Sequence, residues 1–234
     1  MIKIFISGIV LIGNLLCINA QYEHSILKED FKGVRCKGMA KYMLVPSDSN
    51  VVMVTAADEE IFDYIEAEVQ GPFLIINITS KNANITKLFE KVTVKIFYKE
   101  IDHVIMDGGG SLESVGPIIS KQLIANLRGT GRLEIEVECD YFEALMRGTS
   151  MFTVSGKTEH AIANVKGMGS IMAKDLIASN VNITVDGVGS STVYASENLE
   201  ATLNGVGSIK YLGNPKEKDF DVNGLGSIQP YEGD

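Results

Sequence analysis

Tryptophan is absent from the 234 residues of this chain, and cysteine and histidine occur only three times each. Aromatic residues make up 7% of the sequence, which argues against a sugar-binding cleft lined with aromatic rings. Zinc sites take several histidine or cysteine ligands at short spacing. His24, His103 and His160 form no such cluster. We therefore expect neither a bound metal nor a cofactor.

Positive charge is also scarce. Lysine and arginine number 21 against 30 acidic residues, which gives a net charge of −9. Nucleic-acid binding requires a basic patch or stripe to neutralise phosphates, and none is visible in the sequence. Nucleic acid is thus excluded as an expected partner, and a soluble protein with a glycan or protein partner is favoured.

Long apolar runs are missing except near the start of the chain. Lys3 precedes an apolar stretch over residues 4–16, and Ala20 offers a small residue for cleavage. This pattern predicts a secretory signal peptide over residues 1–20, followed by a flexible leader over residues 21–30. No second apolar run follows, so we expect no transmembrane segment after cleavage.

Cys17 leaves open a lipid-anchored form of the protein, although Leu16 disfavours it because lipoprotein signals usually place a small residue before the cysteine. Cys36 and Cys139 are then the remaining cysteines. A bridge between them in an oxidising compartment stays open, but two cysteines do not make a disulfide framework. Two buried free thiols are the favoured interpretation.

A glycine-rich repeat fills the second half of the chain. It includes the segments DGGGSLESV from Asp107, KGMGSIMA from Lys166 and NGVGSIKYL from Asn204. The first glycines of seven such units are spaced by 21, 19, 19, 20, 18 and 19 residues. The glycines assigned to structural turns are Gly108, Gly110, Gly129, Gly131, Gly148, Gly167, Gly169, Gly187, Gly189, Gly205, Gly207, Gly224 and Gly226.

Apolar columns run through these units. The residue two before each first glycine is always apolar, and so is the residue four before it, while the residue just before the glycine is polar or charged. After the glycines, an apolar column begins with Leu112 and Leu133 and is followed by a mainly polar one. Alternation with a period of two is typical of a strand with one buried face.

Each unit is therefore expected to form strand, tight turn, strand and looser turn, and it cannot bury its apolar face alone. Stacking the units predicts an all-β fold, namely a right-handed parallel β-helix or β-solenoid with coils of about 19 residues. The repeats span residues 108–234. Residues 31–107 lack the repeat and are expected to form a less regular β section, either the start of the same stack or a cap on its end. Strand-like runs occur there at 50–56, 64–70, 73–79 and 91–98, with an excursion at 80–90.

Several stretches of this chain resemble the putative auto-transporter adhesin head GIN domain family. The resemblance rests on FKGVRCKGMAKYMLVPSDSNVVMVTAADE at 31–59, DGGGSLES in the middle and NGVGSIKYLGNP at 204–215. It implies a secreted or surface protein of Gram-negative bacteria, a right-handed parallel β-helix, an adhesion role and no recognised catalytic residues. Ser150 and Met151 depart from the pattern, since Gly and Ser usually stand there, and are expected to loosen one turn.

Calcium and phosphate sites are not predicted by the glycine repeats. Calcium-binding β-rolls carry an aspartate after the glycines, whereas here Leu112, Ile171 and Ile209 occupy that position. Phosphate-binding glycine loops join a strand to a helix, whereas strands are expected on both sides of these glycines.

The sequence thus favours a non-enzymatic, secreted or cell-envelope protein that binds or displays a partner on its surface. The oligomeric state and the side of the outer membrane stay open. The candidate surface contacts are Glu113, Glu134, Asn126 and Asn164. Two alternatives remain: an enzyme acting on polysaccharide, which would need clustered carboxylates on one face, and a structural envelope protein that assembles through its ends.

Overall fold

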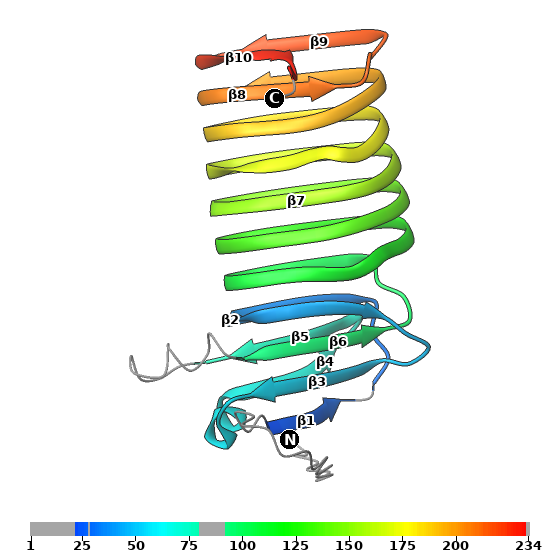
Figure 1. Cartoon of the computed structure of the whole chain (residues 1–234), viewed down its shortest axis with the longest axis vertical. Coiled ribbons are helices and arrows are strands. Elements are labelled where there is room, and N and C mark those ends of the chain that lie inside the picture. Colours follow the sequence, from blue (N-terminus) through cyan, green and yellow to red (C-terminus); the bar gives the residue numbers. More distant parts are fainter. Residues whose placement is uncertain (1–21, 28, 80–91, 233–234) are drawn as a thin grey trace, which may run out of the picture.

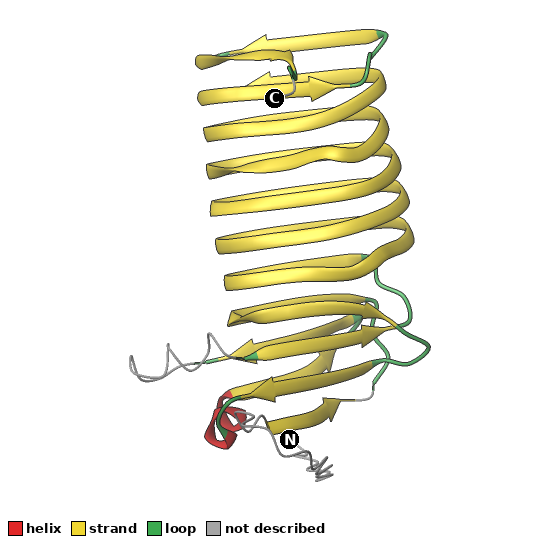
Figure 2. Cartoon of the chain, in the orientation of Figure 1, coloured by secondary structure: helices red, strands yellow, loops and turns green. Residues whose placement is uncertain are grey.

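The protein is built almost entirely of β-strands. The computed structural model describes residues 22–27, 29–79 and 92–232. Its strands are β1 (Tyr22–Leu27), β2 (Gly33–Pro46), β3 (Val51–Ala56), β4 (Ile65–Gln70), β5 (Phe73–Ile78), β6 (Thr93–Tyr98), β7 (His103–Leu203), β8 (Val206–Leu212), β9 (Glu217–Val222) and β10 (Leu225–Pro230). Figure 2 shows them with the one 3-10 helix of this described part, η1 (Glu59–Tyr64). The strands form one open sheet. The expected signal peptide, Cys17 and the excursion at 80–90 lie outside the described residues.

The long strand β7 winds repeatedly across the molecule, with successive windings stacked along the long axis (Figure 1). At its end the stacking is continued by β8, which pairs with β7 in parallel with Val188 opposite Val206. β10 then pairs in parallel with β8, with Leu225 opposite Val206. The pairing therefore joins equivalent positions of neighbouring sequence repeats.

The interior of the stack is formed by the apolar columns. Met106, Leu127 and Met146, two residues before the first glycines, are fully buried, and so are Leu112 and Leu133 beyond them. Side chains of alternate residues point to opposite faces of a strand. The period-two pattern of the sequence therefore places one face of every winding in a shared core.

The last winding departs from that pattern. Phe220 and Val222 occupy the same columns but are 37% and 43% exposed, and Leu225 is 78% exposed. β9 pairs with β7 and β10 with β8. Because these strands are the last along the described chain, their inner faces lack a further winding on one side, and the apolar columns reach solvent there.

The N-terminal section combines the two alternatives left open by the sequence. Residues 33–44 of β2 pair in parallel with the start of β7, with Gly38 opposite Gly108 and Leu44 opposite Ser114. β2 also pairs in parallel with β5 and β6. Beyond them the pairing changes to antiparallel, between β3 and β6 and between β4 and β5. The stack thus begins in β2, and antiparallel strands follow at this end.

The first described residues differ from the expectation of a flexible leader. Tyr22–Leu27 form β1, which pairs antiparallel with β3. The imidazole of His24 stacks on the ring of Phe62 in η1 with centroids 4.1 Å apart. Backbone hydrogen bonds to β3 hold this segment in a strand, which its sequence did not predict. The four strand-like runs expected at 50–56, 64–70, 73–79 and 91–98 correspond to β3, β4, β5 and β6.

Candidate functional site

One side of the stack is formed by the glycine turns, and we call it the glycine edge. It comprises the first glycine of each repeat, the residue before it and the three residues after it. In Figure 1 it lies at the left, where β8 and β10 begin. A Cβ atom added to Gly129 would lie 2.5 Å from the carbonyl oxygen of Gly108, and one added to Gly167 would meet that of Gly148 at the same distance. The windings are therefore in backbone contact along this edge.

The residues just before the first glycines form polar ladders at the two ends of the edge. Near the N-terminal end, Asp107 lies 3.5 Å from the Arg35 Nε and 3.8 Å from the Arg128 Nε. Near the C-terminal end, Asp186 lies 3.8 Å from the Lys166 Nζ and accepts a hydrogen bond of 2.7 Å from the Asn204 amide. Asn223 continues the ladder by donating to the Asn204 side chain at 3.1 Å.

Three cations on consecutive windings connect the two ladders. Arg128, Arg147 and Lys166 precede glycines that are stacked directly on one another, so they occupy the same position on three consecutive windings. We call them the cation row. All three are exposed. The two outer cations each have a carboxylate outside the row, whereas no ion pair of Arg147 occurs within the described part of the chain.

Serine side chains also form a ladder along the glycine edge, over the later windings. The Ser208 hydroxyl donates to the Ser190 Oγ at 3.0 Å, and the Ser190 backbone N–H donates to the Ser170 Oγ at 3.1 Å. Arg132 and Met151 stand at this position on the two windings before Ser170. The ladder is therefore a stabilising contact between windings and not a continuous serine face.

Apolar side chains also gather on the glycine edge. Met168, Val188, Val206 and Leu225 follow the first glycines of the last four repeats, and each is at least 48% exposed. With Met39 and Met151 they account for half of the twelve exposed large apolar residues of the described chain. Met151 and Met168 share windings with Arg147 and Lys166, whereas Val188, Val206 and Leu225 lie beyond the cations.

The four surface contacts proposed from sequence fall in different environments. Glu113 is paired with the Lys41 Nζ at 2.8 Å, and Glu134 is exposed. Asn164 is half-buried. Asn126 is only 7% exposed and so is not available as a surface contact. Its neighbours in the same column are the larger apolar residues Ile105 and Leu145, which explains why an asparagine at an outward position has little exposure.

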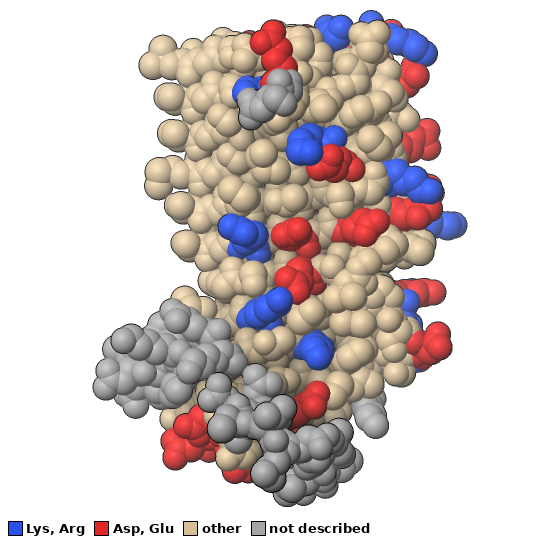
Figure 3. Space-filling view, viewed as in Figure 1, with Lys and Arg blue, Asp and Glu red and all other residues tan. Residues whose placement is uncertain are grey.

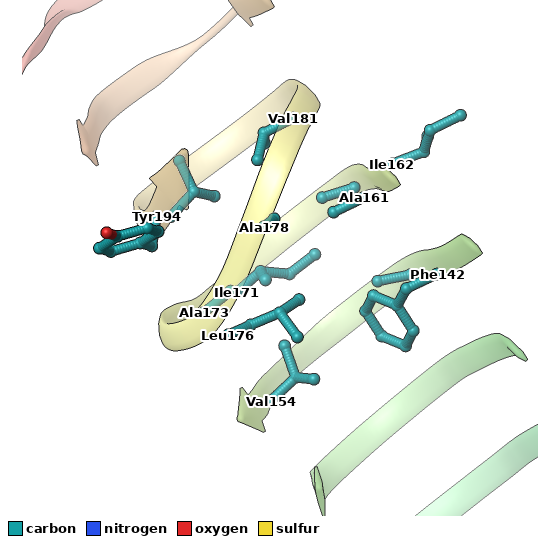
Figure 4. A pocket seen from close by; sticks show the side chains of 13 residues that line it. Phe142, Val154, Ala161, Ile162, Ile171, Ala173, Leu176, Ala178, Val181 and Tyr194 are labelled. Atoms are coloured by element: carbon teal, nitrogen blue, oxygen red, sulfur yellow. The ribbon is translucent and has the colours of Figure 1, made fainter. Parts of the chain in front are cut away.

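A small void lies within the core of the stack. Figure 4 shows side chains of neighbouring windings, among them Phe142, Val154 and Ile171, converging on a narrow space. Five of the lining residues are alanines, which are too small to fill it: Ala144, Ala161, Ala163, Ala173 and Ala178. The void measures about 10 Å³ and has an apolar lining. It is the size of one water molecule, and an apolar void of that kind stays dry.

An open hollow of about 660 Å³ lies at the turns half a winding away from the glycine edge. Its lining includes Lys121, Cys139 and Thr158 together with Glu138 and Lys157, whose charged groups are 2.7 Å apart. Figure 3 shows many charged residues toward the right-hand side of the visible face. Glu138 and Lys157 therefore neutralise each other within the hollow.

The buried titratable groups are held in their neutral forms. Burial raises the pKa of the Cys36 thiol and that of the Cys139 thiol. Burial also raises the pKa of Tyr42, and it raises that of Tyr98 to about 12. Cys36 and Cys139 are both free thiols. Thiols with raised pKa values are poor nucleophiles at neutral pH.

The histidines sit beside single carboxylates. The His103 Nδ1 is 2.7 Å from Asp102, and the His160 Nε2 is 3.7 Å from Glu159. Over the described ranges no group of three metal-ligating side chains is found. The same ranges contain no helix with the length and apolar character needed to cross a bilayer.

One family model matches most of the chain. The family described as "putative auto-transporter adhesin, head GIN domain" matches residues 30–215. No curated protein matches the sequence.

Solved structures resemble the chain over most of its length. A putative adhesin from Bacteroides fragilis has a TM-score of 0.86 at 22% identity, covering 91% of this chain and 97% of its own. A putative lipid binding protein from Parabacteroides distasonis has a TM-score of 0.70 at 24% identity, with the same coverage of both chains. A putative adhesin from the latter species has a TM-score of 0.69 at 19% identity, also with 91% and 97% coverage. At these identities the likeness concerns the fold.

Proposed function

The chain belongs to the putative auto-transporter adhesin head GIN domain family, and we propose that it is a non-enzymatic protein of the bacterial surface that binds a partner along the side of a β-solenoid. Secretion through the signal peptide at residues 1–20 and a right-handed winding are parts of this proposal. The parallel pairing between equivalent repeat positions supports the solenoid. The family description supports an adhesive role.

The observation that carries the proposal is the repetition of exposed side chains at one spacing along the glycine edge. Parallel pairing places equivalent residues of successive windings about 4.8 Å apart. Solenoids use such extended surfaces for binding, because one contact can be repeated along the stack. A non-enzymatic role is supported by the neutral, buried state of both thiols and by the pairing of Glu113 with Lys41.

The test is binding of the purified protein to arrays of glycans and proteins and to extracts of bacterial envelope and host cells. Saturable binding to a defined component, with no turnover of that component during long incubation, is the expected result. Absence of binding to every component, or release of cleaved sugar from a polysaccharide, would contradict the proposal.

Self-assembly through the C-terminal end is a second candidate function, because one observation favours it. Phe220, Val222 and Leu225 expose the apolar columns at the last winding. Open strand edges with apolar neighbours pair readily with other chains. Light scattering after size-exclusion chromatography tests this: assembly predicts a mass that rises with concentration, and a monomer at all concentrations would argue against it.

A further inference from the structure

We propose that the cation row of Arg128, Arg147 and Lys166 is a binding site for an acidic polysaccharide. This inference rests on the proposed function for its premise that the protein binds a surface partner, and it names the chemistry of that partner. The site lies at the position just before the first glycine, where the repeats carry different polar or charged residues.

The balance of charge along the row is the first argument. Arg128 lies near Asp107 on the winding before, and Lys166 lies near Asp186 on the winding after. Each outer cation therefore has its carboxylate on the side away from Arg147. Adjacent windings are about 4.8 Å apart, and at this distance like charges repel. The backbone contacts between the glycines that follow the three cations hold them at this spacing.

The second argument is that no carboxylate among the described residues forms an ion pair with Arg147. The outward positions on either side of it along its own winding are Leu145 and Thr149. The first acidic residue before it is Glu143, four residues away, or about 13 Å along an extended strand. Thr149 and, on the winding before, Arg132 are exposed beside the row and add hydroxyl and guanidinium donors. A bound anion would supply the negative charge that the protein itself does not place there.

The shape of the row identifies the ligand class. A guanidinium group donates two parallel hydrogen bonds to a carboxylate, sulfate or phosphate. Single charge pairs at an exposed site are weak. Several anionic groups on one polymer gain affinity because the later contacts form within the same complex. A polysaccharide bearing an anionic group at short intervals along its chain fits a straight row of cations.

A lipid headgroup carries the same anionic chemistry but fits the edge less well. An anionic membrane surface would be favoured by apolar side chains beside the cations. Most exposed apolar side chains of the edge lie after Lys166, from Met168 to Leu225, while Met151 lies on the Arg147 winding. At Arg128 and Arg147 the adjoining edge residues are Thr130 and Thr149.

The test uses the purified protein with polygalacturonate, dextran sulfate and neutral dextran, and measures affinity by biolayer interferometry. We expect binding to at least one of the acidic polymers and none to neutral dextran. Arg147→Glu should weaken that binding by about tenfold or more, because a charge-assisted contact is lost and repulsion replaces it. Arg147→Lys should weaken binding less than Arg147→Glu does, because the charge stays while the paired hydrogen bonds of the guanidinium are lost. Thermal unfolding of the variants verifies that the exposed substitution leaves the fold intact.

Lys121→Glu is the matched control, because it makes the same charge reversal in the hollow half a winding away. It should change the affinity by less than about twofold. No binding to either acidic polymer, equal binding to neutral dextran, or an equal loss in Lys121→Glu would overturn the inference. Binding only to vesicles containing phosphatidylglycerol would assign the site to lipid and overturn it as well. If the protein binds array components but fails these tests, the proposed function stands and only the cation row is rejected as the binding site.

Discussion

At the first glycines of the glycine edge, an added Cβ atom would clash with a backbone carbonyl oxygen of the neighbouring winding. At Gly148 a Cβ atom would meet the Gly129 oxygen, and at Gly187 it would meet that of Gly167. Gly129 and Gly148 also have φ values of 109° and 122°, which disfavour residues with a side chain. Close packing of the windings and backbone conformation thus select glycine together.

Gly129→Ala should lower the free energy of unfolding by about 3 kcal/mol, because it combines an unfavourable φ with a clash against the Gly108 oxygen. Gly116→Ala is the control, since Gly116 has a φ of 83° but nothing within 4 Å of its added Cβ. It should cost only about 1 kcal/mol. Urea unfolding measures both values. Equal losses would show that the backbone conformation alone, and not the contact between windings, requires glycine.

Ser150 stands where neighbouring repeats have glycine, and its buried Oγ has no hydrogen-bond partner among the described residues. Ser150→Ala should be neutral or raise the free energy of unfolding by up to about 1 kcal/mol, because an unsatisfied buried hydroxyl is removed. Ser170→Ala, which deletes the acceptor for the Ser190 N–H, should lower it by about 1 kcal/mol. A loss for Ser150→Ala in the same urea assay would mean that the hydroxyl has a partner such as bound water.

At the scale of elements, the two ends of the stack differ. β1 and β3 pair antiparallel at the N-terminal end. At the other end β9 has no buried residue, and the apolar columns reach solvent at Phe220 and Val222. Stability in a stacked repeat depends on contacts with neighbouring windings. The C-terminal winding is therefore expected to open more readily than the middle of β7.

Hydrogen exchange measured by mass spectrometry tests this difference. Amides of β9 and β10 should exchange through local opening, at least about tenfold faster than amides of β7 around Leu133 and Phe152. Uniform protection from the middle of β7 to β10 would contradict the expectation and indicate that a further contact covers the C-terminal end.

Much of this arrangement was predictable from the sequence, because alternation reports which side of a strand is buried. The columns of Met106 and Leu112 follow directly from the period of two. The winding at Gly38 was missed, because its second glycine is replaced by Ala40 and β3 to β6 intervene before the next one. Asn126 was placed on the surface because the pattern gives direction but not the size of the neighbours. The isolation of Arg147 depends on which carboxylates pair with its neighbours, and only the register between windings shows this.

At the scale of the whole molecule, several buried cysteine thiols and tyrosine hydroxyls are neutral at physiological pH. Desolvation raises the pKa of Cys36 above its ordinary value of 9.0 and that of Tyr42 above 10.0, and it raises the pKa of Tyr98 to about 12. In the unfolded chain these groups ionise at their ordinary values. Their contribution to stability is therefore complete below about pH 9, and it is lost as the pH rises through the ordinary values toward the folded ones.

The melting temperature should consequently fall steeply between about pH 9 and pH 12. Tyr98→Phe should reduce the slope above about pH 10, because one of the raised pKa values is removed. It should not lower stability at neutral pH, since the buried Tyr98 hydroxyl has no hydrogen-bond partner in the part of the chain that the structure describes. Differential scanning calorimetry across this range measures both effects, and an unchanged slope in the variant would show that Tyr98 ionises equally in both states.

The parallel register between windings also makes the length of the protein adjustable in fixed steps. Val188 pairs with Val206, and Val206 with Leu225, so one added repeat of 18 or 19 residues returns the chain to the same position one strand spacing further on. Each insertion of that size would extend the molecule by about 4.8 Å and keep equivalent residues in register. In homologues that gain or lose whole repeats after the cation row, its distance from the C-terminal end would therefore change in steps of one strand spacing.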